Sequence, residues 1–208
     1  MAHDDTLTCS ECGKSFTLSS ERRRQYPGWK PKLCLTCYKR AKGRPELNLT
    51  TTEVLQRFSG GPDTGIFTDG SCAKNPDGPG GWGVVKVVDG APVAEKCGHA
   101  KVTTNNRMEL TALIEGFKML GANEEMVIYT DSQYCQNVAT KWASAWKRNG
   151  WARGKKGGEV KNLDLVKELY EQAQAHPKAR VEWARGHAGC RWNEYADSLS
   201  TAYTRTVR

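Results

Sequence analysis

The chain has 208 residues, of which 38% are hydrophobic and 26% are charged. A chain of this length can bury one sizeable core and a small second one. It has no apolar run near the roughly 20 residues that a membrane span needs, and its first residues lack the plan of a secretory signal. We therefore expect a folded, soluble, non-exported protein, and its Trp and Tyr content argues against disorder.

Basic residues are concentrated in two parts of the chain. The net charge is +8, from 31 Lys and Arg against 23 Asp and Glu. Residues 1–45 carry 10 basic and 4 acidic residues, and residues 141–161 carry 7 and 1, so each segment has a net charge of +6. The rest of the chain is mildly acidic. Two solvated surfaces would also explain this pattern, but the clustering of basic residues in two segments favours a polyanionic partner.

Four of the eight cysteines form two pairs with metal-ligand spacing. Each pair has the form Cys-x2-Cys, and 21 residues separate Cys9 and Cys12 from Cys34 and Cys37. Two such turns brought together give a tetrahedral four-cysteine zinc site. A disulfide framework would require an oxidising compartment, and a redox motif would not need two pairs. We predict structural zinc, which would stabilise a segment too small to fold by its apolar content. The other four cysteines are expected to be reduced.

The segment 46–62 is predicted to be a linker, in which a short amphipathic run at 54–58 could form a helical turn. Three strands follow, and turns containing Asp and Gly separate them, which favours antiparallel hairpins. We place these strands at 64–71, 82–88 and 92–100, with the turns at 77–81 and 89–90.

Helices and two more strands make up the remainder. Leu110, Leu113, Ile114 and Phe117 recur with helical spacing, so a helix is expected over 106–120, with Asn106 and Glu109 at its cap. The later elements are a strand at 126–130, a helix from about 132, a helix at 163–173, a strand at 181–184 and a helix at 190–204. This order predicts an α/β fold with a mixed sheet flanked by helices.

Four acidic residues lie at element ends or on a helix face. Taken singly, Asp69 before Gly70 could be a turn residue, and Glu109 could close a capping box. Asp131 could cap a helix, and Asp197 could simply be solvated. The contexts of these residues, together with the loop around His187, weigh against four unrelated explanations. These contexts are Thr68-Asp-Gly-Ser-Cys72, Thr103-Thr-Asn-Asn-Arg-Met-Glu-Leu110, Thr130-Asp-Ser-Gln-Tyr134, Gly186-His-Ala-Gly-Cys190 and Asn193-Glu-Tyr-Ala-Asp197.

Together these segments resemble ribonuclease H of type 1, in that family's order, over about residues 64–203. The resemblance implies a mixed five-stranded sheet flanked by helices, over residues 63–208. The preceding residues 1–45, with Cys9-Ser-Glu-Cys12 and Tyr26-Pro-Gly-Trp-Lys-Pro-Lys-Leu-Cys34, resemble a small zinc ribbon. The implied activity is hydrolysis of the RNA strand of RNA–DNA hybrids, leaving 5′-phosphate and 3′-hydroxyl ends.

The resemblance also implies roles for the acidic residues. Two Mg²⁺ ions, or Mn²⁺ as an alternative, would be held by Asp69, Glu109, Asp131 and Asp197, with Asp69 bridging both ions. Hard divalent ions prefer such oxygen ligands, and a metal pair can clamp a phosphodiester. His187 would assist proton transfer, although a lone His is more often a surface or packing residue.

Further residues match the family's substrate contacts. Five polar or small residues would face the minor groove of the hybrid, namely Gly70, Ser71, Asn75, Asn105 and Gln133. Thr104 and Asn162 would hold a DNA phosphate. Turn and cap chemistry would equally suit Asn75 and Asn105.

The segment 141–156 resembles the family's basic protrusion. Lys147 and Arg148 would contact phosphates, with Lys155 and Lys156 beyond them. Trp142 and Trp146 share one helical face and are expected to pack this protrusion rather than stack on bases.

Two other functions remain open at this point. The chain could be a related nuclease of the same fold that cleaves DNA, or a catalytically weak adaptor protein that binds hybrids. The ribbon could add affinity for nucleic acid or dock a protein. We expect an RNA–DNA hybrid as partner, no membrane contact, a monomeric state and a cytoplasmic location.

Overall fold

The computed structural model describes residues 5–10, 12–18, 20, 31–32, 34, 48–154, 158–184 and 189–205. The chain divides into two compact units, Met1–Asn48 and Leu49–Arg208. In the described part of the chain, no helix is long and apolar enough to cross a membrane.

The first unit contains a two-stranded antiparallel hairpin. Its strands are β1 (Asp5–Thr8) and β2 (Ser15–Leu18), with Thr8 opposite Ser15. Between them, the amide of Gly13 donates to the carbonyl of Cys9, and Gly13 has a φ of +69°. That left-handed conformation suits glycine and turns the chain tightly after Cys9. The amide of Ser10 donates to the carbonyl of Lys32, which ties this turn to the segment before Cys34.

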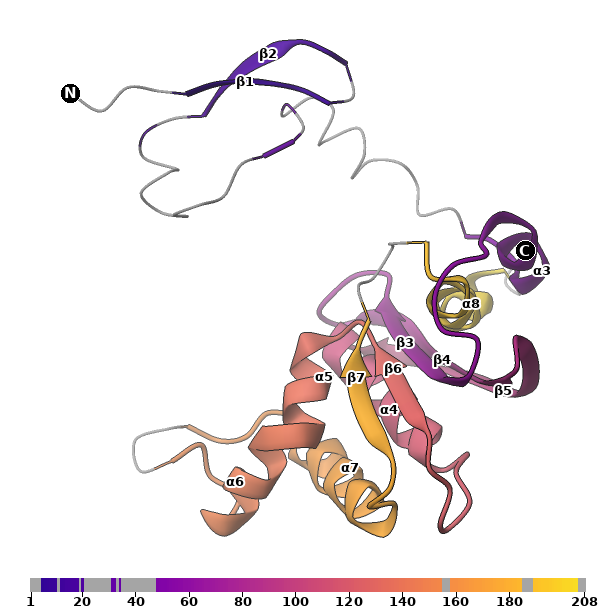
Figure 1. Ribbon diagram of the computed structural model, residues 1–208. Helices are drawn as coiled ribbons and strands as arrows, with labels where there is room; N and C mark the ends of the chain where they lie inside the picture. The colour runs from indigo at the N-terminus through magenta and orange to yellow at the C-terminus, as the bar shows by residue number, and fades with distance from the viewer. Residues whose placement is uncertain are drawn as a thin grey trace. The chain divides into compact units, whose positions relative to one another are not determined.

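The second unit is built on one mixed five-stranded sheet, as predicted. The strands are β3 (Gly65–Cys72), β4 (Gly78–Val88), β5 (Ala91–Thr103), β6 (Val127–Thr130) and β7 (Arg180–Trp183). Their order in the sheet is β5-β4-β3-β6-β7. The pairs β3–β4 and β4–β5 are antiparallel, whereas β6 runs parallel to both β3 and β7. The central strand β3 therefore joins the antiparallel and parallel halves (Figure 1).

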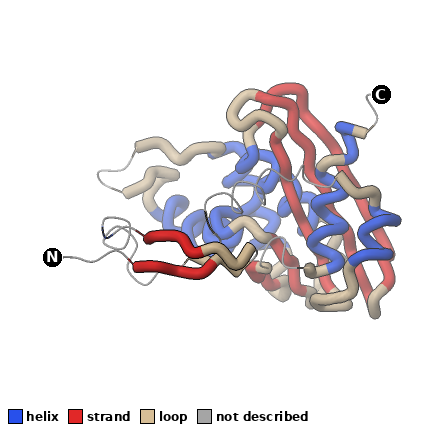
Figure 2. The backbone as a smooth tube through the Cα atoms, turned by 90° about the horizontal axis from the view of Figure 1, so that it is seen from above, coloured by secondary structure: helices blue, strands red, loops and turns tan. Residues whose placement is uncertain are grey.

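Helices cover both faces of the sheet (Figure 2). The helices are α3 (Thr51–Arg57), α4 (Asn105–Phe117), α5 (Gln133–Asn137), α6 (Ala143–Arg148), α7 (Leu163–Ala175) and α8 (Arg191–Ser200). A π-helical segment, Val138–Trp142, joins α5 to α6, and a 3₁₀ turn, Ala202–Thr204, follows α8. One core lies between the sheet and α4, α5 and α7. The other lies between the sheet and α3 and α8.

The segment expected to be a linker differs from that expectation in part, since the possible helical turn is present but belongs to a folded segment. Residues 51–57 form α3, and Leu49 begins the second unit. Thr50 caps the helix in a reciprocal capping box with Glu53, and Val54 is buried against α8 and the sheet. The amphipathic run thus has an apolar face to bury, so much of the predicted linker folds as part of the second unit.

The glycine-rich stretch before Trp82 also differs from its prediction as a turn. Strand β4 begins at Gly78 and includes Gly80, Gly81 and Gly83. A Cβ on Gly83 would lie 2.5 Å from the Leu199 Cβ and 2.7 Å from the Ser200 amide nitrogen. Gly83, together with Gly81, therefore allows α8 to pack closely on the strand rather than serving a change of chain direction.

The long helix α4 starts earlier than predicted. Thr104 has extended backbone angles and accepts a hydrogen bond from the amide of Arg107, so Thr104 is the cap in place of Asn106. The helix ends at Phe117, before the predicted stop near Gly121. Threonine and asparagine are both good caps, and local sequence does not rank them here. As a result, Glu109 lies beyond the cap and its carboxylate is available to neighbouring elements.

Candidate active site

The candidate site is built around Asp69 in the central strand. Asp69 lies opposite Gly83 in β4, and its side chain accepts a hydrogen bond of 2.8 Å from the Ser200 hydroxyl of α8. Only 9% of Asp69 is exposed. A carboxylate this buried is costly when ionised unless hydrogen bonds or cations compensate it.

Glu109 reaches the same region from the first turns of α4. A Cβ on Gly70 would overlap the backbone of Met108 and Glu109, so the missing side chain lets β3 touch α4 directly. One Glu109 oxygen accepts from the Asn105 amide at 2.7 Å, and the other accepts from the Ser132 hydroxyl. Both carboxylate oxygens are thereby oriented by polar neighbours.

Asp131 and Asp197 complete the group. Asp131 follows β6, and its backbone carbonyl accepts a 2.9 Å hydrogen bond from the Trp183 indole at the end of the parallel strand β7. Asp197 lies on α8, one helical turn before Ser200. The four acidic residues thus come from β3, α4, the end of β6 and α8, as the sequence predicted.

Contacts between neighbouring elements bring these residues together, because Ser200 donates to Asp69 and lies against the Asp197 carbonyl, and Ser132, next to Asp131, donates to Glu109. Burial raises the pKa of Asp69 well above its usual range, and the charges of Asp131 and Asp197, then of Glu109, raise it further. The Ser200 hydrogen bond acts in the opposite direction. Burial also raises the pKa of Glu109, and Asp131 adds to that shift, while the Ser132 hydrogen bond opposes it.

This donor set fits hard divalent cations. Its members are carboxylate oxygens around a buried position, which Mg²⁺ and Mn²⁺ prefer over softer ligands. A bound cation would also relieve the mutual repulsion that raises the pKa of Asp69.

Several predicted substrate contacts lie beside this site. The backbone amide of Asn105 donates to the Asn75 side chain, so these two residues are joined at 3.1 Å. Ser71 follows Gly70 in β3 and its hydroxyl donates to the Ser200 carbonyl. Gln133 is exposed in the first turn of α5, and Thr104 caps α4. Asn105 and Thr104 therefore have structural partners in addition to their predicted roles. His187 lies outside the described residues.

The predicted protrusion is formed by α6 and the segments around it. The Trp142 and Trp146 rings are 5.8 Å apart, and Trp146 packs against the core while Trp142 remains 38% exposed. Lys147 and Arg148 are exposed, and the Lys147 ammonium lies 4.5 Å from the Tyr170 ring centre. Asn162 hydrogen-bonds Tyr134 at the base of this region. Lys155 and Lys156 lie outside the described residues.

Sequence reasoning missed several residues that hold the carboxylates. Ser132 and Ser200 donate to Glu109 and Asp69, and Trp183 fixes the backbone of Asp131. Ser132 follows Asp131 directly and could have been suspected from that position. Ser200 and Trp183 gave no such signal, because each meets its partner only through the packing of distant elements.

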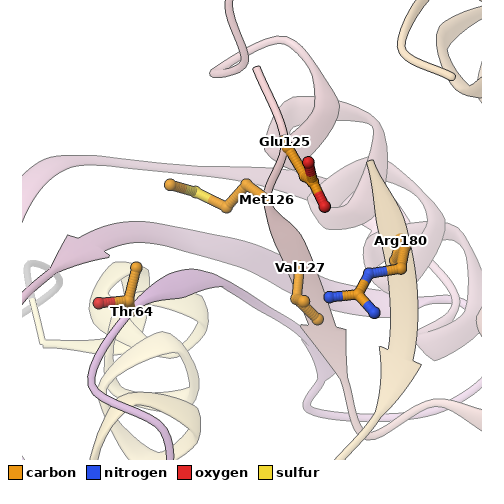
Figure 3. Close-up of a pocket in the computed structure, with 5 residues that line it drawn as sticks. All are labelled: Thr64, Glu125, Met126, Val127 and Arg180. Atoms are coloured by element: carbon orange, nitrogen blue, oxygen red, sulfur yellow. The ribbon is translucent and has the colours of Figure 1, made fainter. Parts of the chain in front are cut away.

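The cavity shown in Figure 3 lies away from the carboxylates. It has a volume of about 360 Å³ and is lined by Thr64, Glu125, Met126, Val127 and Arg180. These residues precede or begin β3, β6 and β7, whereas Asp69 and Asp131 lie toward the carboxyl ends of β3 and β6. The carboxylate cluster is therefore at the opposite end of the parallel strands.

Three of the predicted zinc ligands come together in the first unit. The sulfur atoms of Cys9, Cys12 and Cys34 all lie within 4.8 Å of one another. Cys9 is buried, and the turn at Gly13 places it beside Cys12. Cys37 lies outside the described residues.

Comparison with known proteins decides the family. The model of the family described as RNase H matches residues 62–204, which span β3 to α8 and all four acidic residues. This chain belongs to the ribonuclease H family.

Curated relatives of this family cover the same region. A protein named Ribonuclease H from Pseudomonas entomophila is 47% identical over 143 residues, which is 69% of this chain and 94% of the relative. A protein named Ribonuclease HI from Pseudomonas putida is 45% identical with the same coverage. Among solved structures, LC9-RNase H1, described as a type 1 RNase H with the type 2 active-site motif, has a TM-score of 0.56 and 31% identity. That likeness covers 72% of this chain and 76% of the other.

Proposed function

We propose that this chain is an endonuclease that hydrolyses the RNA strand of RNA–DNA hybrids without sequence specificity. The observation that carries the proposal is the convergence of Asp69, Glu109, Asp131 and Asp197 in a ribonuclease H fold. Relatives at 45–47% identity are named Ribonuclease H and HI. The products would carry 5′-phosphate and 3′-hydroxyl ends.

The four carboxylates, Asp69, Glu109, Asp131 and Asp197, would hold two Mg²⁺ ions. Such ions would supply activation of the attacking water and stabilisation of the leaving oxygen. The chain's own contribution is to fix the ligands in advance. Asn105 and Ser132 orient Glu109, and Ser200 donates to Asp69. Donors that orient metal-ligating carboxylates in this way raise the affinity of a site for its ion.

His187 would move a proton near the reacting groups. In the sequence, His187 stands between Gly186 and Ala188, after β7, which carries Trp183, and before α8, which carries Asp197. A histidine titrates near neutral pH and can both accept and donate a proton. Its contribution is to the rate, whereas the carboxylates are essential.

The hybrid would be held by two kinds of contact. Polar groups at Gly70, Ser71, Asn75, Asn105 and Gln133 would read the minor groove, where the 2′-hydroxyls of the RNA strand are accessible. Thr104, Asn162 and the exposed Lys147 and Arg148 would contact phosphates of the DNA strand, which gives affinity without sequence preference.

We also propose that the first unit holds a structural zinc ion. The clustering of Cys9, Cys12 and Cys34 supports this, with Cys37 as the fourth thiolate. The net charge of +6 over residues 1–45 supports a contribution to nucleic-acid affinity. In bacteria, where the relatives named above are found, replication and transcription take place in the cytoplasm, so we place the protein there, and we propose that it acts as a monomer.

Cleavage of a strand-labelled hybrid tests the main proposal. The full chain is incubated with RNA–DNA, RNA–RNA and DNA–DNA duplexes, with Mg²⁺ or with EDTA. Asp69→Asn is compared with Asp89→Asn, which removes an exposed carboxylate in the β4–β5 turn, where φ is +50° and Asn is tolerated. We expect Mg²⁺-dependent cutting of the hybrid's RNA strand by wild type and Asp89→Asn, and none by Asp69→Asn. Hybrid binding without cutting would indicate an adaptor instead, and cutting of DNA duplexes a related DNA nuclease.

A further inference from the structure

Ser200 occupies an unusual position at the end of α8. It is the last residue of the helix and is completely buried. Its hydroxyl lies 2.8 Å from Asp69 Oδ2 and 2.9 Å from the carbonyl oxygen of Asp197. A serine hydroxyl has one proton to donate, and a carboxylate is the stronger acceptor of the two. The hydroxyl thus stands between the side chain of one acidic residue and the backbone of another.

The backbone of Ser200 is fixed to β3, the strand that carries Asp69. The Ser71 hydroxyl donates to the Ser200 carbonyl at 3.2 Å, and Ser71 lies two residues after Asp69 on the same face of β3. A Cβ on Gly83 would lie 2.7 Å from the Ser200 amide nitrogen, so β4 also touches this residue directly. These contacts with β3 and β4 therefore fix the position of Ser200 on the sheet and the rotation of the end of α8 about its axis.

Asp197 precedes Ser200 by three residues on α8, so both residues lie on one side of the helix. A shift or rotation of the helix end would move Asp197 relative to Asp69. The Ser200–Asp69 bond resists such a shift and also selects one orientation of the Asp69 carboxylate. An ionised carboxylate has about four lone-pair sites, so the hydrogen bond from Ser200 leaves other sites on the Asp69 carboxylate available to bind cations.

We propose that Ser200 is a positioning residue for the divalent-metal site, setting the orientation of Asp69 and its spacing from Asp197. This inference rests on the proposed function, since it assigns Ser200 to the same carboxylate group. Its consequence is that the hydroxyl contributes to metal affinity, and not only to packing of the helix. Donors that orient metal ligands typically contribute about 10-fold or more to metal affinity.

Ser198 provides a matched control on the same helix. It is equally buried, with 1% exposed, and its hydroxyl donates to the carbonyl of Leu49 at 2.6 Å. Ser198→Ala removes a buried hydroxyl and its hydrogen bond from α8 without touching the carboxylates. Ser200→Cys keeps a small side chain with a weak donor, and serves where Ser200→Ala does not fold.

The test measures Mg²⁺ binding by isothermal titration calorimetry on the full chain without substrate. Hybrid cleavage (kcat and KM) and thermal unfolding in EDTA are measured in parallel. We expect Ser200→Ala to weaken Mg²⁺ binding about 10-fold and to lower kcat at fixed Mg²⁺ with KM for the hybrid unchanged. Ser200→Cys should be intermediate, and Ser198→Ala should keep wild-type Mg²⁺ affinity even if it melts earlier.

Wild-type Mg²⁺ affinity in both Ser200 variants would overturn the inference and leave Ser200 a packing residue. Equal losses of Mg²⁺ affinity in Ser198→Ala and Ser200→Ala would overturn it as well. If the wild-type chain binds Mg²⁺ but does not cut hybrids, the proposed function fails, while the calorimetric comparison still decides the role of Ser200.

Discussion

The backbone of Gly70 lies directly against the first turns of α4, where a Cβ carbon would stand 2.7 Å from the Cα of Glu109. Gly70 follows Asp69 in β3, so this contact sets the distance between two of the four acidic residues. The sequence suggested Gly70 as a groove contact, and the structure adds a packing reason for glycine at this position.

Replacing Gly70 by alanine should therefore impair catalysis more than folding. The added methyl group must push β3 and α4 apart, and a displacement of about 1 Å near reacting groups can reduce kcat by roughly 100-fold. Gly158→Ala is the control, because no atom of the described residues, its chain neighbours apart, lies within 4 Å of a Cβ built there. Steady-state cleavage and circular dichroism of both variants check the expectation. Full activity in Gly70→Ala would show that this contact is easily relaxed.

Replacing Asp69 by asparagine should raise stability in the absence of metal. Burial, and then the charges of Asp131 and Asp197, raise the pKa of Asp69, so the ionised carboxylate is unfavourable in the folded protein. A neutral amide removes that repulsion, and about 1 kcal/mol shifts Tm by roughly 2–4 °C in a chain of this size.

Thermal unfolding of wild type and Asp69→Asn in EDTA and in Mg²⁺ measures this effect. The variant should melt a few degrees higher in EDTA, and Mg²⁺ should stabilise it less than wild type. A lower Tm in EDTA would mean that the hydrogen bond from Ser200 outweighs the repulsion.

The ion pair between Arg107 and Asp164 should make stability depend on acid pH. Two hydrogen bonds of 3.1 and 2.7 Å join the start of α4 to the start of α7, and they lower the pKa of Asp164. The stabilisation is complete above the unfolded-state pKa near 4 and is lost as pH falls through the lower folded-state pKa. Because the Asp164 side chain is 61% exposed, we expect no more than about 1 kcal/mol.

Urea unfolding of Asp164→Asn against wild type at pH 7 and pH 3 checks the sign of this effect. The difference should be full at pH 7 and smaller at pH 3. Glu171→Gln, which removes an exposed carboxylate from the same helix, should show no such pattern. An equal loss at both pH values would mean that packing, rather than charge, is responsible.

The basic protrusion should determine the affinity for the hybrid and should have little effect on the turnover rate. Lys147 and Arg148 are exposed in the last turn of α6, so alanine at both positions should raise KM and leave kcat nearly unchanged. The slope of log affinity against log salt should fall by about 1–2. Arg148 should contribute more, because Lys147 already lies over the Tyr170 ring. Lys178→Ala, an exposed lysine between α7 and β7, is the control, and an unchanged salt slope in the double variant would argue against the contact.

Metal analysis of the full chain should find one zinc ion per chain. Cys9→Ser should abolish it, because Cys9 is buried among the clustered sulfur atoms. Cys97→Ser, which changes an exposed cysteine in β5, should retain the zinc. A zinc-free wild type, purified without chelator, would refute the proposed ion.

The body of the fold was predictable because its signals are local. Helical spacing at Leu110 and Leu113 and the apolar run before Asp131 fix elements whose order determines the sheet. The role of Gly83 was not predictable from the sequence, since glycine in a turn and glycine beneath a helix look alike until α8 is placed. Ser200 meets Asp69 across 131 positions of sequence, so no short pattern contains both residues.

The hydrogen bond between Ser200 and Asp69 joins the last helix to the first strand of the sheet, and this separation in sequence has a consequence for biosynthesis. Asp69 lies in the first strand of the sheet and Asp197 in the last helix, so nearly the whole second unit must leave the ribosome before its acidic residues can meet. A nascent chain shorter than this would hold Asp69, Glu109 and Asp131 without their final partner. On the proposed assignment of the four carboxylates, the site is complete only once α8 has been translated, and a nascent chain that ends before α8 should not cleave hybrids.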